Sequence, residues 1–303
     1  MICVLFALLT AFSNATASVL QRRAAAGAPE REAFHLSLLT YLLRRRVWLA
    51  GIGMTIVAAL CQAAALATGP VALVQPIFII ELPFALLLAG LVVRHGLPRR
   101  TWYAVAAVTG GLGISLASAA PSGGTDTSSN QLWALALIAT GGFEAVLLAG
   151  ALRTRGEPRA ALLGLAAACG YALTAALLKQ AMAALPGGAG HFFTTWQLYG
   201  TAAVGVGSLF LLQNALQAGT LVSSQPMLTL GDALISVCLG VLLFDEDIRL
   251  GWWLVPEVMG LAAIAAGVVE LSRSPLASGI RPDVPEAART ADDVADVAGA
   301  RNY

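Results

Sequence analysis

Several acidic side chains lie within long apolar stretches of the chain, where ionisable residues are rare. Glu81, Glu144 and Asp232 lie deep inside such stretches, and Glu257 lies nearer the start of another. A charged side chain at the centre of a bilayer costs roughly 2.5–3.5 kcal/mol on insertion scales. One cation inside an apolar stretch, Lys179, cannot pair with three deep acids, which are therefore expected to be protonated, hydrated or beside a cation. These acids suit proton coupling or a cationic substrate. Glu81 and Asp232 could equally bind a hard divalent cation.

Each acid also has a purely structural interpretation, as a protonated carboxyl that hydrogen-bonds inside the helix bundle. That interpretation stays open above all for Glu144 and Glu257. A functional role is favoured for Asp232 first and for Glu81 second.

A polar stripe runs along the apolar stretch 219–243. Its members recur at helical spacing and share one helix face: Gln225, Thr229, Asp232 and Ser236. Such a face turns toward protein or water rather than lipid. Two more apolar stretches carry similar stripes: Thr10, Asn14, Ser18 and Gln21 in the first, and Thr194, Gln197, Thr201 and Ser208 in the seventh. Together the stripes predict a shared polar cavity, although hydrogen bonding between helices explains any single Ser or Thr equally well.

Two Gln-Pro pairs, Gln75-Pro76 and Gln225-Pro226, lie inside apolar stretches. A proline in a helix interior removes a backbone hydrogen bond and exposes the carbonyl four residues earlier. Broken membrane helices are tolerated where they line a cavity, and matching breaks in two halves indicate a binding site. Pro76 and Pro226 are therefore predicted to break their helices beside a site to which both glutamines contribute neutral polar contacts. A packing kink is the alternative.

The composition places all these residues in a membrane protein. The chain has 303 residues, of which 58% are hydrophobic and 12% charged, and its mean hydropathy is +0.77. A soluble domain carries about 25% charged residues. The fold is predicted to be all-α, because helices satisfy every backbone polar group within a bilayer. Nine membrane spans are predicted: 2–20, 47–67, 70–93, 101–119, 132–152, 160–182, 192–212, 219–243 and 252–271.

The distribution of Lys and Arg predicts the orientation. Basic residues gather in the segments 21–46, 94–100 and 153–159, whereas 120–131 and 186–190 have none. Because basic loops stay on the cytoplasmic side, the N-terminus is predicted outside and the C-terminus inside, in the cell inner (plasma) membrane. The apolar segment 34–43 is too short to cross and is interpreted as interfacial or re-entrant. If it does cross, there are ten spans and the N-terminus lies inside.

The sequence contains an internal repeat. Residues 69–117 align without a gap with 219–267, so that Gln75-Pro76 meets Gln225-Pro226 and Trp102 meets Trp252. Because the basic loop 94–100 aligns with an acidic segment, FDEDIRL, the two copies are predicted to cross in opposite directions. Inverted repeats of this kind build secondary transporters with the substrate site at mid-membrane between the copies. Duplication of a bundle that transports nothing is the alternative.

This interpretation divides the chain into a first repeat (1–119), a linking span with its loops (120–158), a second, inverted repeat (159–271) and a tail (272–303) expected to be disordered and cytoplasmic. Arg22 and Lys179 occupy matching repeat positions. They are predicted to gate the pathway or to neutralise charge near its ends.

The chain resembles the drug/metabolite transporter superfamily, EamA-like, and is most similar to its NIPA-type magnesium transporter branch. The resemblance rests on cationic helix ends in both halves (SVLQRR and TAALLKQ), on VWLAGIGM at 47–54 and on GPVALVQP at 69–76. The resemblance implies a transporter with nine spans. The chain departs from that branch at two places, where Gln62 and Arg94-His95 stand instead of acids.

The predicted function is secondary transport of a small metabolite, drug or cation by alternating access, with proton coupling as one mode. A NIPA-like magnesium transporter or channel is the alternative, and a partner subunit that does not transport is a third. No enzymatic activity and no cofactor are predicted, because the sequence lacks hydrolase and metalloprotease motifs. The expected partners are the substrate and the lipid bilayer. The net charge of +1 gives no reason to expect nucleic acid, and a homodimer stays open.

Overall fold

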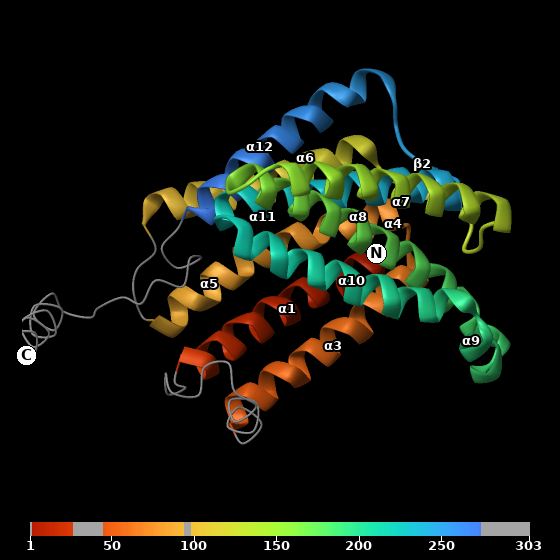
Figure 1. Cartoon of the computed structure of the whole chain (residues 1–303), viewed down its shortest axis with the longest axis horizontal. Coiled ribbons are helices and arrows are strands. Elements are labelled where there is room, and N and C mark those ends of the chain that lie inside the picture. The colour runs from red at the N-terminus through yellow and green to blue at the C-terminus, as the bar shows by residue number, and fades with distance from the viewer. Residues whose placement is uncertain (1, 27–44, 94–97, 274–303) are drawn as a thin grey trace, which may run out of the picture.

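The protein is almost entirely helical in the computed structural model, which describes residues 2–26, 45–93 and 98–273 (Figure 1). The segment 34–43 lies outside these ranges. The predicted tail also lies outside them from residue 274 onward, whereas Ser272 is the last residue of the last helix and Arg273 follows it. The helices are α1 (Ile2–Ala26), α3 (Arg46–Thr68), α4 (Val71–Ile77), α5 (Glu81–Val93), α6 (Arg99–Ala119), α7 (Asn130–Arg153), α8 (Glu157–Ala183), α9 (Ala189–Thr194), α10 (Trp196–Ala218), α11 (Leu221–Phe244) and α12 (Leu254–Ser272). Short 3-10 turns cover Phe78–Ile80, Leu185–Gly187 and Gly251–Trp253, and the two strands are β1 (Ser122–Gly123) and β2 (Glu246–Asp247).

Eight helical segments in the described part of the chain are long and apolar enough to cross a membrane. This is the architecture of an all-α, multi-pass membrane protein. The stretch predicted as the seventh span, 192–212, is the exception. Its first residues belong to the short helix α9, and α10 extends instead to Ala218. The last turns of α10 carry Gln213, Asn214 and Gln217, which lower its hydropathy, so the nine-span count stays a prediction.

Large apolar side chains cover the outer surface of the bundle. On α7, Ile138 is 73% exposed and Val146 is 71% exposed, and on α10 Val206 is 70% exposed. Contiguous apolar surface of this kind is uncommon on soluble monomers. Within a bilayer it contacts lipid, and the outward faces of these helices need no further partner.

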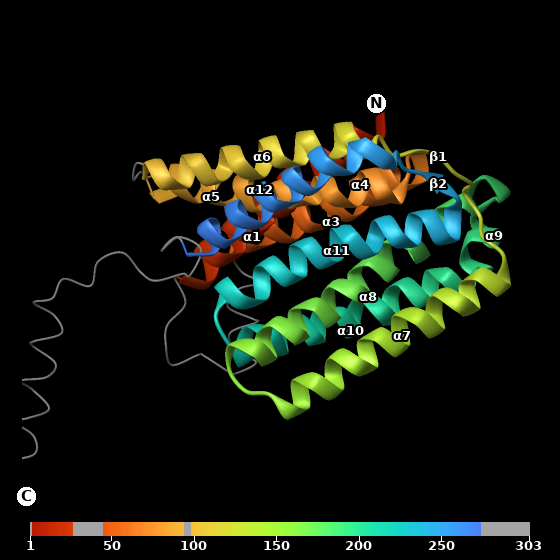
Figure 2. The same cartoon turned by 90° about the horizontal axis from the view of Figure 1, so that it is seen from above.

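The helices pack in matched pairs. In the first half α1 packs along α3, and in the second half α8 packs along α10. Across the halves, α4 packs on α11 and α6 packs on α12. Figure 2 shows α4 beginning and α11 ending at the end of the bundle where β1 and β2 lie, so these two helices run in opposite directions. These directions are the ones that inverted repeats require, while the repeat itself and its boundaries stay predictions.

The two strands join the halves at that end of the bundle. β1 follows α6 and β2 follows α11, and they pair antiparallel with Ser122 opposite Asp247. Both helices end in a left-handed residue, Ala120 (φ 36°) and Asp245 (φ 52°), which turns the chain into the strand. The β1–β2 ribbon thus fixes the loop after α11 against the loop after α6.

Close contact between α6 and α12 depends on glycine. A Cβ added to Gly260 would lie 2.6 Å from the carbonyl oxygen of Gly111, and a Cβ added to Gly267 would lie 2.9 Å from that of Ala104. Small residues let membrane helices approach closely, because packing rather than the hydrophobic effect holds them together in lipid. The α6–α12 interface is therefore intolerant of added volume.

Replacing Gly260 with Ala is expected to destabilise the protein by about 1–3 kcal/mol, because two backbones would have to separate. The matched control is Gly110→Ala, at the aligned position of the repeat, where an added Cβ meets nothing within 4 Å. Thermal unfolding in detergent would measure both variants. Equal midpoints for the two would show that the helices are not packed this closely.

Candidate functional site

The third span is broken in its middle. Helix α4 ends at Ile77, a 3-10 turn covers Phe78–Ile80, and α5 begins at Glu81. Pro76 lies inside α4, and Pro83 lies in the first turn of α5, where it cannot donate to the carbonyl of Ile79. The break predicted at Pro76 is therefore present, and two prolines flank it. It places Glu81 directly after a 3-10 turn in the middle of the span, and the backbone N–H of Glu81 donates to Phe78 O within that turn.

The break predicted at Pro226 is wrong, because α11 is a continuous helix through that residue. The position of the repeat that aligns with Pro83 is Ala233. The second half therefore lacks the second proline that interrupts the first half. A single missing hydrogen bond near the start of a long helix is tolerated, because the following turns are intact.

Polar residues of four helices meet in the interior, and we call Asn14, Glu81, Tyr171, Asp232 and Ser236 the central polar cluster. Asn14 of α1 donates a hydrogen bond to the carboxyl of Glu81. Tyr171 of α8 interacts electrostatically with the carboxyls of both Glu81 and Asp232. Ser236 donates to Asp232 Oδ1 over 3.4 Å, one turn along α11. Tyr171 thus lies within electrostatic reach of two carboxyl groups, one on α5 and one on α11.

The depth of this cluster follows from where its members lie in their helices. Asn14, Tyr171 and Asp232 lie near the middle of α1, α8 and α11, and Glu81 lies near the middle of the broken third span. These four side chains are half-buried, whereas Ser236 is fully buried. Carboxyl groups at this depth are costly unless they are protonated, paired or hydrated.

The polar stripe of α11 faces this interior. Gln225, Thr229 and Asp232 are half-buried, whereas Met227 and Leu234 are 40% and 49% exposed on the opposite side of the helix. The helix thus presents its apolar side to lipid and its polar side to the other helices, as the spacing predicts.

Gln75 of α4 has an unused hydrogen-bond donor. Its side chain is 3% exposed, and its Nε2 has no partner among the described residues. A buried donor without a partner costs about 1–3 kcal/mol, so such groups usually meet a water or a ligand. Gln75 can therefore donate to a hydrogen-bond acceptor that enters the bundle.

Among the described side chains, Glu144 and Gln197 have their contacts outside the central polar cluster. Glu144 of α7 interacts electrostatically with Cys169 of α8. Gln197 is buried on α10, and its carbonyl accepts from Thr201. Arg22 lies in the last turns of α1, and its side chain is outside the described part.

Lys179 does not contact the deep acids but pairs with Glu246 of β2. Its Nζ lies 2.8 Å from Glu246 Oε1, and the side chains are 4% and 0% exposed. The two oxygens of Glu246 also accept from the backbone N–H groups of Val71 (2.7 Å) and Ala72 (2.8 Å). The ring of Phe244 lies 4.6 Å from Nζ. The carboxylate of Glu246 thus accepts from three donors: two backbone N–H groups and the ammonium of Lys179.

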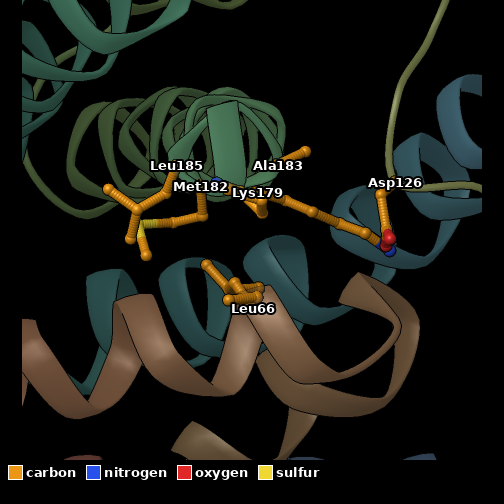
Figure 3. A pocket seen from close by; sticks show the side chains of 8 residues that line it. Leu66, Asp126, Lys179, Met182, Ala183 and Leu185 are labelled. Atoms are coloured by element: carbon orange, nitrogen blue, oxygen red, sulfur yellow. The ribbon is translucent and has the colours of Figure 1, made fainter. Parts of the chain in front are cut away.

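A cavity of about 360 Å³ adjoins this pair. Lys179, Met182, Ala183 and Leu185 contribute to it from α8 and its end, Leu66 from α3, and Asp126 from the loop after β1 (Figure 3). Its lining is mainly apolar, and Lys179 is the part of the ion pair that borders it. The cavity lies at the β1–β2 end of the bundle, far from the central polar cluster along α8.

The sequence-based reasoning missed Tyr171 and Glu246. Tyr171 lies midway along α8, and this position at mid-depth was the available signal. Glu246 was assigned to an acidic loop. The signal was the presence of a buried lysine for which no deep acid was a suitable partner. Among the described residues, no three His, Cys, Asp or Glu side chains form a group that could hold a metal ion.

Comparisons with known proteins give one distant likeness. No family model matches the chain, and no solved structure matches it. An uncharacterized protein of Corynebacterium glutamicum is 24% identical over 281 residues, which cover 90% of this chain and 96% of that protein. The chain is therefore similar to that bacterial protein over almost the whole length of both.

Proposed function

We propose that the protein is a secondary transporter of the drug/metabolite transporter superfamily that moves a small metabolite, drug or cation by alternating access. It would lie in the inner membrane with its N-terminus outside and its C-terminus in the cytoplasm, as its basic loops predict. The proposal rests on the site, because the distant relative carries no named activity.

One observation carries this proposal. Glu81 and Asp232 lie at mid-depth on helices of opposite direction, and Tyr171 interacts with both. Carboxyl groups inside a membrane are costly and usually mark ion or substrate pathways. Half-helix ends and unwound segments at the interface of two repeats are typical binding elements of secondary transporters. The 3-10 turn that interrupts the third span lies directly before Glu81 and supports this comparison.

The acids would bind a cationic substrate or carry the coupling proton. The neutral groups Asn14, Gln75, Gln225, Thr229 and Ser236 would supply polar contacts. The unpartnered Nε2 of Gln75 supports this role, because it needs an acceptor. Glu144 and Gln197 would line the pathway at its periphery.

Uptake into proteoliposomes would test the proposal. The purified full chain is reconstituted and a panel of amino acids, cationic drugs, Mg²⁺ and small metabolites is offered with and without a proton gradient. We expect at least one compound to accumulate above protein-free liposomes. If no compound of any class moves in either direction, the transporter proposal is wrong.

A magnesium transporter or channel is the second candidate. Glu81, Asp232 and the amide oxygen of Asn14 are hard oxygen groups in one neighbourhood, which suits a divalent cation that keeps several waters. Millimolar Mg²⁺ is then expected to raise the thermal midpoint of the detergent-solubilised protein. Glu81→Gln should abolish this shift, and Asp245→Asn, a change at an exposed acid outside the cluster, should retain it. An unchanged midpoint with millimolar Mg²⁺ argues against this candidate.

A further inference from the structure

The ion pair of Lys179 and Glu246 joins parts of the chain that belong to different halves. Lys179 lies on α8, Glu246 follows α11, and its hydrogen bonds reach the first two residues of α4. Gly240 makes room for this arrangement, because an added Cβ there would contact Glu246 Oε2. The pair therefore holds the start of α4, from the first half, against two helices of the second half.

The opposite end of the bundle has a weaker counterpart. The start of α11 aligns with the start of α4 in the repeat, and Gly69 and Gly219 precede the two helices with extended backbones. At α11 the carboxylate of Glu157 accepts from Thr220 N at 3.3 Å and from Thr220 Oγ1 at 3.1 Å. Glu157 is exposed and has no cation within 4 Å among the described residues. The two ends thus differ in burial and in charge pairing.

We infer that the Lys179–Glu246 pair is the closed gate of the pathway at the β1–β2 end, and that the protein opens there by separating α4 from α8 and β2. This inference rests on the proposed transport function, because a gate needs two alternating states. Breaking a buried pair requires water to reach both charges. The cavity of about 360 Å³ borders the pair at Lys179, so water has room to approach that charge.

Further contacts make the gate a unit with the β1–β2 ribbon. Thr125 N donates to Phe244 O (2.6 Å), and Arg249 N donates to Ala119 O (2.9 Å). Opening must therefore move the β1–β2 ribbon together with Glu246. The gate then has two discrete conformations, closed and open, rather than a continuous range of conformations.

A native thiol reports on this end of the bundle. Cys3 is 6% exposed and packs against Gly69. Val71 follows Gly69 by two residues, and its backbone N–H donates to Glu246. Cys169 is 1% exposed and lies ten residues, or about 15 Å, before Lys179 on α8. An opening of the gate should expose Cys3, whereas global unfolding should expose both thiols.

The test measures alkylation of the full chain by N-ethylmaleimide in detergent, using two backgrounds that retain only Cys3 or only Cys169. Lys179→Met and Glu246→Gln are expected to raise the Cys3 rate about tenfold or more and to leave the Cys169 rate unchanged. Glu157→Gln, which changes the acid at the start of α11 at the other end, should change neither rate. Unchanged Cys3 rates, or equal increases at both thiols, would show that the pair is only structural.

A second variant tests the gate without removing either charge. Cysteines at Ser122 and Asp247, which lie opposite each other in the β1–β2 ribbon, can form a disulfide that locks it. The oxidised lock is expected to lower the Cys3 rate about tenfold relative to its reduced form. A lock without effect overturns the inference even if both charge variants fail to fold. None of these readouts requires a known substrate, so the gate can fail while transport stands.

Discussion

Replacement of Asp232 with Asn is expected to lower transport in proteoliposomes about tenfold or more, which is about 1.4 kcal/mol or more in the rate-limiting step. The amide keeps the size of the side chain and can still accept from Ser236. It cannot carry a proton or balance the charge of a cation. Because Asp232 faces the same tyrosine as Glu81, Glu81→Gln should show a loss of the same kind.

The control for this experiment is Asp245→Asn. Asp245 is an exposed acid in the left-handed conformation that ends α11, and asparagine adopts that conformation readily. This variant should transport like the wild type, using whichever compound the panel identifies. If Asp232→Asn transports at the wild-type rate with the same pH dependence, Asp232 has no part in the mechanism.

Removal of Glu246 is expected to produce the largest loss of stability. Glu246→Ala leaves the ammonium of Lys179 buried without its partner and two backbone N–H groups without an acceptor. Removing one member of a buried ion pair typically costs about 3–5 kcal/mol. The measurement is thermal or denaturant unfolding of the purified protein in detergent.

Two variants make this result specific to the pair. Glu157→Ala removes the acid that accepts from Thr220 at the start of α11, and its effect should be much smaller because Glu157 is exposed. Combining Lys179→Met with Glu246→Gln should cost less than the two single changes added together, because residues in contact are energetically coupled. Strict additivity, or an equal loss from Glu157→Ala, would contradict the buried pair.

Local composition determined much of the architecture. Long apolar runs with few charged residues determine where the helices form. In lipid, the backbone N–H and C=O groups of a segment must hydrogen-bond within that segment. The positions of Glu81 and Asp232 at mid-depth follow from the same runs, and the spacing of Gln225, Thr229 and Asp232 correctly placed these residues on an inward face of α11.

Tertiary structure decided which groups meet. Nothing in the sequence near Lys179 names Glu246, which is 67 residues away and enters the bundle only because Asp245 turns the chain after α11. The same holds for Tyr171, whose electrostatic relation to both acids depends on how α8 packs against α11 and α4. Pairing of distant polar groups is a property of packing, because a buried charge selects whichever partner the fold delivers.

Helix continuity shows the same division. The sequence gives both halves a Gln-Pro pair, yet only the third span breaks, because Pro83 adds a second interruption that Ala233 does not. Periodicity and hydropathy therefore determined the helices, their depth and the polar faces. Tertiary contacts decided the partner of each buried charge and the end of the bundle at which the buried ion pair lies. Such contacts form between distant segments, which local sequence rules treat independently.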